Sequence, residues 1–251
     1  MRRPAPSNPL ARPLLAGWRR RAASVLLGGL LAGCQTTPTV HIDWSGGPFF
    51  HATNFTGLDT LPLDVLRVAV LPPAGLEDVP TESAAGLEAA LRLTLTAAAR
   101  FETVFAAPGL VRAAVGRNAI GSTEALPPEL FDRVTRELGA DAVLLTDITL
   151  LRAYPPLALG VRMKLVRLQG NRPILWAFDQ VFDCRNLAVA NSAQLHAAGG
   201  KTEAAGAGGG AGVLQSPSRF ADYVFAETFA TLPHRGAAPS GPIKVPRKPA
   251  D

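Results

Sequence analysis

The sequence predicts an α+β domain in which helices pack on a mixed β-sheet, and three observations carry this prediction. Two β-α units come first, each with a short apolar run and a helical repeat of leucine or valine. Three further strand-like runs follow with no helix between them. A last helical pattern closes the domain. The order β-α-β-α-β-β-β and then a helix is typical of a mixed sheet with helices on one or both faces.

The first half of this core holds two strands, each followed by a helix. The first strand is a β-branched and apolar run that stops at Pro72 and Pro73. Thr81 is the expected N-cap of the first helix, and Gly139 the residue that ends the second. The expected elements are strands at 66–71 and 101–105 and helices at 81–100 and 127–138, with an irregular segment at 106–126 that contains one helical turn.

The second half holds three strands and two helices. In the second of these strands, apolar side chains alternate with Arg162 and Lys164, which indicates one buried face and one solvent face. In the third strand, one face is apolar and largely aromatic, and we assign it to the core; its members are Ile174, Trp176, Phe178 and Phe182. The expected elements are strands at 141–151, 161–165 and 174–182 and helices at 186–198 and 216–232.

The segment before the domain has the pattern of an export signal. Three arginines, 19–21, precede the apolar run 22–30, and Leu31-Ala32-Gly33-Cys34 follows that run. This tetrapeptide resembles the lipobox of bacterial lipoproteins, in which the cysteine thiol receives a diacylglycerol and becomes the new N-terminus. The resemblance implies lipidation of Cys34 and attachment to the membrane through lipid alone. Gln35, where an inner-membrane lipoprotein has Asp, implies the outer membrane, with the domain facing the periplasm.

These patterns divide the chain into four parts. The stretch after Cys34 is rich in Pro and Gly, with some order expected around its aromatic residues, and the end of the chain is rich in Pro and basic residues. We expect a signal peptide at 1–33, a tether at 34–64, an α+β periplasmic domain at 65–233 with a flexible Gly/Ala-rich loop at 199–216, and a disordered tail at 234–251.

The basic character of the chain belongs to the signal peptide. The formal net charge is +5, but residues 1–33 contain six arginines and no Asp or Glu, so their removal takes the charge to about −1. A near-neutral mature protein gives no electrostatic reason to expect a nucleic-acid partner.

The chain contains two cysteines, Cys34 and Cys184. With Cys34 acylated, Cys184 has no disulfide partner within the chain. We interpret Cys184 as a small, partly buried thiol, and the alternative is an exposed reactive or intermolecular thiol.

The ionisable side chains form no pattern typical of an enzyme. Neither a His-Glu-x-x-His nor a Gly-x-Ser-x-Gly motif occurs, and the histidines are spread over the tether, the border of the Gly/Ala-rich loop and the tail. The carboxylates nearest the sheet are expected to end strands or face solvent rather than to converge as acid and base. We therefore expect no catalytic residue, metal site or cofactor. The residues concerned are His41, His51, His196, His234, Asp141, Asp147, Asp179 and Asp183.

A basic stripe is formed by Arg162, Lys164 and Arg167. Its simplest interpretation is the solvent face of an antiparallel strand. The alternative is a docking surface for an acidic partner.

Four segments carry a resemblance to a known family. They are Arg-Val-Ala-Val-Leu-Pro-Pro (67–73), Ala-Arg-Phe-Glu-Thr-Val (99–104), Glu-Leu-Gly-Ala-Asp-Ala-Val-Leu (137–144) and Pro-Ile-Leu-Trp (173–176). In this order they resemble the periplasmic domain shared by the TolB amino-terminal region, the penicillin-binding-protein activator LpoB and the curli secretion lipoprotein CsgG. The resemblance spans 66–183 and implies a binding domain of the cell envelope. The chain departs from the family at Pro73, where an aromatic residue is usual, and at Thr146, where Gly often stands.

Three functions follow from these patterns, and we expect the first. It is a lipid-anchored, non-enzymatic cell-envelope protein whose periplasmic domain binds an envelope-assembly partner. The second is a subunit of an oligomeric CsgG-like secretion channel, although 106–126 lacks the alternation of a membrane-inserted hairpin. The third is an envelope hydrolase, for which no nucleophile–base motif occurs.

Overall fold

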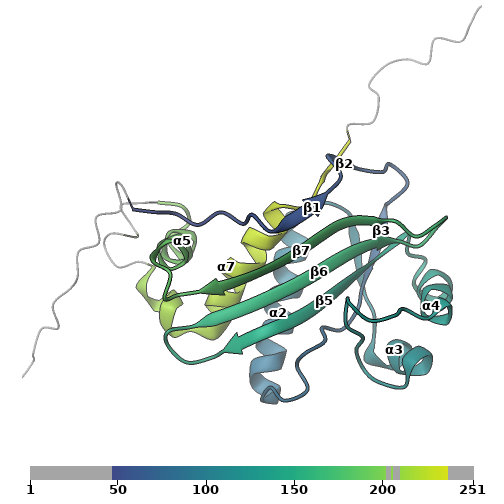
Figure 1. Ribbon diagram of the computed structural model, residues 1–251, viewed down its shortest axis with the longest axis horizontal. Helices are drawn as coiled ribbons and strands as arrows, with labels where there is room; N and C mark the ends of the chain where they lie inside the picture. Colours follow the sequence, from purple (N-terminus) through teal and green to yellow (C-terminus); the bar gives the residue numbers. More distant parts are fainter. Residues whose placement is uncertain (1–46, 202–204, 206–209, 237–251) are drawn as a thin grey trace, which may run out of the picture. The chain divides into compact units, whose positions relative to one another are not determined.

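A six-stranded mixed sheet forms the centre of the computed structural model, which describes residues 47–201, 205 and 210–236 (Figure 1). Helices pack on both faces of the sheet, which confirms the predicted α+β class. The strand order is β1-β7-β6-β5-β3-β4, with β1 (Phe55–Gly57), β3 (Arg67–Val70), β4 (Glu102–Phe105), β5 (Ala142–Arg152), β6 (Ala158–Arg167) and β7 (Ile174–Asp183). The helices are α2 (Thr81–Ala98), α3 (Pro108–Val115), α4 (Pro128–Leu138), α5 (Leu187–Ala197) and α7 (Pro217–Ala230), with a 3₁₀ turn η2 (Ala211–Gln215).

The two predicted β-α units supply the parallel part of the sheet. Strand β3 pairs in parallel with β4 on one side and with β5 on the other. Val68 and Val70 belong to the core on one face of the sheet, and Ala69 belongs to the core on the opposite face. A strand that is covered on both faces has a continuous apolar sequence, which is why this strand could be located so readily from the sequence.

The remaining strands are antiparallel and longer. Strands β5, β6 and β7 form a meander, and Trp176, Phe178 and Phe182 of β7 are all buried in the larger core, as predicted. Ile174 was expected on the same face, but it pairs with Val166 beyond a register irregularity and is 53% exposed.

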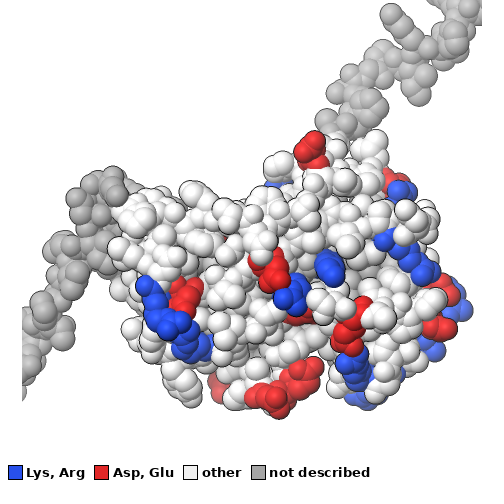
Figure 2. Space-filling view, viewed as in Figure 1, with Lys and Arg blue, Asp and Glu red and all other residues white. Residues whose placement is uncertain are grey.

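The two faces of the sheet are covered differently. Helices α2, α5 and α7 contribute to the larger core, and α2 and α7 run side by side behind β5–β7 in Figure 1. Helices α3 and α4 form the smaller core with β3 and β5. The front of β6 and β7 therefore carries no helix, and Figure 2 shows that acidic and basic side chains lie next to one another there.

Helix ends follow the sequence signals in most places. Gly139 adopts a left-handed conformation, with φ of 60°, and ends α4 as predicted. Thr81 was expected to cap α2, but it is the first helical residue and Pro80 occupies the cap position without a side-chain hydrogen bond. Pro108 begins α3, which has eight residues instead of the single turn that we expected.

The described part of the predicted tether folds onto the domain. Residues 34–46, Trp44 included, lie outside the described residues, so the tether remains an expectation only for them. Residues 47–54, which we call the strap, lie against α5 and β7: the backbone N–H of Phe50 donates to Ser192 Oγ (2.8 Å) and that of Asp179 donates to the Asn54 carbonyl (3.0 Å). Strand β1 then pairs with β7 in antiparallel register, which extends the sheet by one edge strand.

Two other segments that we expected to be irregular are also partly ordered. Within 199–216, residues 211–215 form η2, and the side chains of Ala205 and Val213 are buried. At the start of the predicted tail, β8 (His234–Arg235) pairs in parallel with β2 (Thr60–Leu61) in a small second sheet. Residues 237–251 lie outside the described residues.

Gly75 is required by the loop between β3 and α2. Its φ is +82°, and a Cβ at this position would lie 2.3 Å from the carbonyl oxygen of Ile148. We expect Gly75→Ala to lower the free energy of unfolding by more than about 2 kcal/mol, since both the backbone conformation and the contact become unfavourable.

A matched control for this substitution is Gly86→Ala. Gly86 lies inside α2, and a Cβ there meets no atom within 4 Å. It should raise the free energy of unfolding by about 0.5–1 kcal/mol because Ala favours helix over Gly. Urea unfolding followed by circular dichroism measures both effects, and equal stability of the two variants would contradict the prediction.

Candidate functional site

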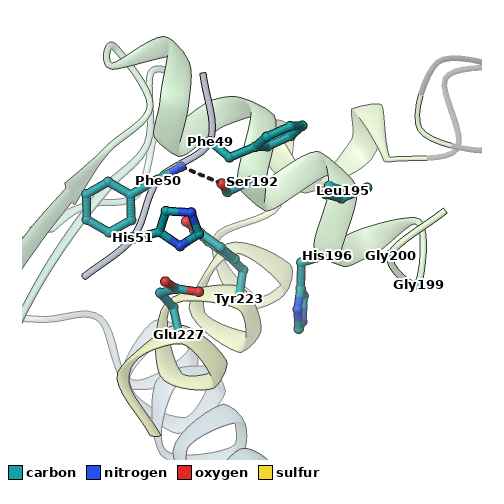
Figure 3. A pocket seen from close by; sticks show the side chains of 10 residues that line it. All are labelled: Phe49, Phe50, His51, Ser192, Leu195, His196, Gly199, Gly200, Tyr223 and Glu227. Carbon is teal, nitrogen blue, oxygen red and sulfur yellow. Dashed lines mark hydrogen bonds between the residues drawn. The ribbon is translucent and has the colours of Figure 1, made fainter. Parts of the chain in front are cut away.

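The candidate binding site is a cleft between the strap, α5 and α7, with a volume of about 570 Å³ (Figure 3). This volume is within the range of small-ligand sites in proteins. We call it the strap cleft. Its lining residues are Phe49, Phe50, His51, Ser192, Leu195, His196, Gly199, Gly200, Tyr223 and Glu227.

The strap forms one wall of the cleft and is fixed by contacts to α5. Asn191 Nδ2 donates to the Pro48 carbonyl (3.2 Å), next to the hydrogen bond from Phe50 N–H to Ser192 Oγ that Figure 3 shows. The ring of Phe50 also lies 5.1 Å from that of Phe182 in β7, centroid to centroid. The position of this wall is therefore set by α5 and by the aromatic side chains of the sheet.

Tyr223 of α7 forms the floor of the cleft. Its side chain is 2% exposed, and its ring centroid lies 5.9 Å from that of His196 and 5.9 Å from that of Phe182. Among the described residues, its buried hydroxyl has no hydrogen-bond partner. Burial raises the pKa of this hydroxyl, and the nearby carboxylate of Glu227 raises it further. The hydroxyl is therefore protonated at neutral pH.

Among the described residues that line the cleft, Glu227 is the only acidic one, and none is Lys or Arg. Its Oε1 accepts one long hydrogen bond, from the backbone N–H of Ala52 (3.4 Å). Within the described part of the chain, Glu227 makes no ion pair. Asp222, one residue before Tyr223, is half-buried, and burial raises its pKa. The cleft thus presents a half-buried carboxylate without a counter-charge.

The structure brings together two histidines that the sequence placed in unrelated segments. His51 was expected in the tether and His196 beside the Gly/Ala-rich loop, yet both line the strap cleft. In the ranges that the structure describes, no group of three or more His, Cys, Asp or Glu side chains is arranged to hold a metal ion. His41 lies outside those ranges, and His234 belongs to β8.

Most of the cleft was not predicted from the sequence. Ser192 and Tyr223 lie on helices that were predicted, but no local pattern indicates that a segment more than 140 residues earlier would cover them. The available signal was the pair Phe49-Phe50 in an otherwise Pro- and Gly-rich stretch, since adjacent aromatic residues indicate packing against a core.

Asp147 differs from the prediction that the carboxylates near the sheet end strands or face solvent. It is 8% exposed and lies in β5. Its Oδ1 accepts from the Ser122 backbone N–H (2.7 Å) and its Oδ2 from Ser122 Oγ (2.6 Å), while Lys164 Nζ donates to the Ser122 carbonyl (2.8 Å). Both carboxylate oxygens are occupied, so Asp147 holds the loop before α4 against the sheet.

The other three carboxylates each have partners of their own. Asp141 Oδ2 accepts from the backbone N–H groups of residues 66 and 67, both at 2.9 Å. Asp179 pairs with Arg162 (2.7 Å). Asp183 pairs with Arg185 (2.6 Å) and Arg152 (3.1 Å), and hydrogen bonding to Arg185 in particular holds the pKa of its carboxyl well below the usual value. Asp141 thus binds the backbone at the start of β3, whereas Asp179 and Asp183 form ion pairs.

The basic stripe is already engaged by the chain itself. Arg162 pairs with Asp179, Lys164 binds the Ser122 carbonyl, and Arg167 pairs with Asp64. A surface whose cations are compensated within the domain has little charge to offer an acidic partner. The structure therefore gives no support to the alternative that this stripe is a docking surface for an acidic partner.

A second cleft, of about 750 Å³, lies beyond the carboxyl ends of β3 and β4, where open α/β sheets often bind ligands. Its wall includes Arg112 and Arg117. Arg112 Nε donates to Asn118 Oδ1 (2.8 Å), and Arg117 pairs with Glu124. Because both arginines already have partners within the domain, we consider this cleft a weaker candidate binding site than the strap cleft.

Cys34, the predicted lipidation site, lies outside the described residues, so its role remains a prediction from the sequence. Among the helices that the structure describes, none is both long enough and apolar enough to cross a membrane.

Cys184 is a free, half-buried cysteine that follows β7, in agreement with its interpretation as a partly buried thiol. Burial raises the pKa of its thiol to about 11, and the adjacent carboxylate of Asp183 contributes in the same direction.

Comparisons with known proteins give weak structural likenesses. No known protein family and no curated protein matches the sequence. Among solved structures, the PelC dodecamer from Paraburkholderia phytofirmans is 16% identical, with a TM-score of 0.36, covering 54% of this chain and 87% of that chain. Lipoprotein GNA1162 from Neisseria meningitidis is 18% identical, with a TM-score of 0.35 and coverages of 47% and 82%. The LpoB C-terminal domain from Salmonella enterica is 16% identical, with a TM-score of 0.31 and coverages of 56% and 98%.

LpoB is one of the proteins whose domain the sequence motifs resemble. At these identities and TM-scores, however, the likenesses carry no argument about activity or partners, which have to be argued from the chain itself.

We expect Cys184 to react slowly with iodoacetamide in the folded protein. At pH 8, a thiol with a pKa of about 11 has about 100-fold less thiolate than an ordinary thiol with a pKa of 9.0. The measurement is mass spectrometry of alkylation over time in a Cys34→Ser variant, with and without 8 M urea. Folded and unfolded rates within threefold of each other would show that the thiol is exposed and reactive.

Proposed function

We propose that the protein is a non-enzymatic lipoprotein of the outer membrane, anchored through lipid on Cys34, whose periplasmic domain binds a partner in envelope assembly. The lipid anchor is supported by the order of three features along the chain. An apolar run comes first, Leu31-Ala32-Gly33-Cys34 follows it, and the folded domain comes after. The signal peptide would be residues 1–33.

The structure shortens the tether in this proposal. Gly47 is the first described residue and already contacts α5, because a Cβ built on it would lie 2.8 Å from Asn191 Nδ2. Only residues 35–46 then separate the lipidated cysteine from the domain. Fully extended, this stretch spans about 45 Å, which sets the greatest distance between the domain and the bilayer surface.

The strap cleft supports the partner-binding part of the proposal. It is open to solvent, its walls are aromatic, and its carboxylate lacks a counter-charge. Aromatic residues around a polar group are typical of the centre of protein interfaces. The strap that forms its wall follows directly from the tether, so the cleft lies on the part of the domain nearest to Cys34 along the chain.

Replacement of Cys34 by Ala tests the anchor. We expect Cys34→Ala to abolish incorporation of an alkyne-labelled palmitate and to move the protein from the membrane to the soluble fraction, because no other group would be acylated. Cys184→Ala is the matched control and should keep both label and membrane association. Palmitate labelling that persists in the Cys34→Ala protein would contradict the anchor.

Site-specific crosslinking in cells tests the partner. We expect a photoreactive amino acid at Leu195, which lines the strap cleft, to give a discrete crosslinked product with one envelope protein. The same amino acid at Leu93, which lies on α2 and is exposed, is the control and should give none. Mass spectrometry identifies the product. Equal products from both positions, or none from Leu195, would contradict binding at this cleft.

A further inference from the structure

We propose that the strap cleft binds a lysine or arginine side chain of the partner polypeptide, with Glu227 as counter-charge and aromatic rings as walls. This inference rests on the proposed function, since it names the chemistry by which the partner is recognised at that site.

The charge of the cleft indicates the charge of its ligand. Glu227 is half-buried, accepts one long hydrogen bond on Oε1, and forms no ion pair with Lys, Arg or His among the described residues. By contrast, the similarly half-buried Asp183 is paired with two arginines. A carboxylate that lines an open cleft without a counter-charge attracts a cation and repels an anion. The ligand that the cleft fits is therefore a cation.

The walls carry the second step. Phe49, Phe50, His196 and Tyr223 line the same cleft as the carboxylate. Aromatic ring faces attract Lys ammonium and Arg guanidinium groups and also pack against their aliphatic stems. An uncharged polar ligand would gain much less from such walls.

The polar atoms of the cleft carry the third step. Oε2 of Glu227 accepts no hydrogen bond among the described residues, since the one bond to this side chain is on Oε1. A carboxylate oxygen is an acceptor, and both Lys and Arg are donors only. The ligand and this acceptor are thus complementary.

The same residues argue against a lipid headgroup as the cation. An ethanolamine headgroup carries a phosphate a few bonds from its ammonium group. The described lining residues include no Lys or Arg that could receive the phosphate, and the carboxylate of Glu227 would repel it. A Lys or Arg side chain carries its cation on a neutral stem, so the carboxylate does not repel any other part of it.

The test uses the mature chain with Cys34→Ser, which cannot be lipidated, labelled with ¹⁵N. The probes are the blocked pentapeptides acetyl-Ala-Ala-Lys-Ala-Ala-amide and its norleucine analogue, which has the same stem without the charge. We expect the lysine peptide to shift the amide resonances of Phe50, Ser192 and Tyr223, and the norleucine peptide to bind at least tenfold more weakly.

The matched variants are Glu227→Gln and Glu129→Gln. Glu227→Gln keeps an oxygen that can accept from Ala52 N–H, so the strap stays in place, but it removes the charge. It should weaken binding of the lysine peptide at least fivefold. Glu129 is an exposed carboxylate in the first turn of α4, on the other core, and Glu129→Gln should leave binding unchanged.

Four results would overturn the inference. One is equal binding of the lysine and norleucine peptides, and another is equal binding by the Glu227→Gln variant. The third is a set of cleft shifts with phosphatidylethanolamine bicelles but none with the lysine peptide, which would assign the cleft to lipid. A crosslink from Leu195 that persists in Glu227→Gln cells would also overturn it, while leaving the proposed function intact.

Discussion

Burial of the aromatic face of β7 is the interaction on which the rest of the domain depends. Trp176, Phe178 and Phe182 follow one another with ring centroids 5.9 and 6.4 Å apart, and all three are buried. Helix α7 packs against this face, and so do α2 and α5. At its far end, Phe182 contacts both Tyr223 of α7 and Phe50 of the strap. The walls of the strap cleft are thus an extension of the core, which gives them fixed positions before any ligand binds.

Periodicity located the central elements because their side chains are buried in a regular way. Strands 66–71 and 141–151 and the helix that Gly139 ends agree with the structure to within one or two residues. Strand β1 escaped prediction because three residues at a sheet edge show no alternation, and the backbone of β7 rather than its own side chains holds it in place. Thr81 failed as a cap because Pro80 already supplies the extended conformation that a cap position requires.

The candidate site was harder to predict than the fold because it joins residues far apart in the chain. The strap contacts α5 across 142 positions and α7 across 175. Charge patterns were misleading for the same reason: Arg162, Lys164 and Arg167 alternate with apolar residues as a basic stripe in the sequence, but partners from three other segments compensate them in space. Conversely, a carboxylate that forms no ion pair among the described residues, such as that of Glu227, can be recognised only after the neighbouring chain segments are in place.

The strap also has a mechanical consequence. In a chain anchored at Cys34, any pull between the membrane and the domain acts along residues 35–46 and reaches the folded part first at the strap. Two hydrogen bonds to α5 and the Phe50–Phe182 contact resist that pull before β1 does. If the anchor and the ligand are as proposed, a load that peels the strap from α5 would remove one wall of the cleft and release its occupant, whereas an occupant that touches both walls would strengthen the attachment. Tension on the anchor and occupancy of the cleft would then be coupled through the eight residues of the strap.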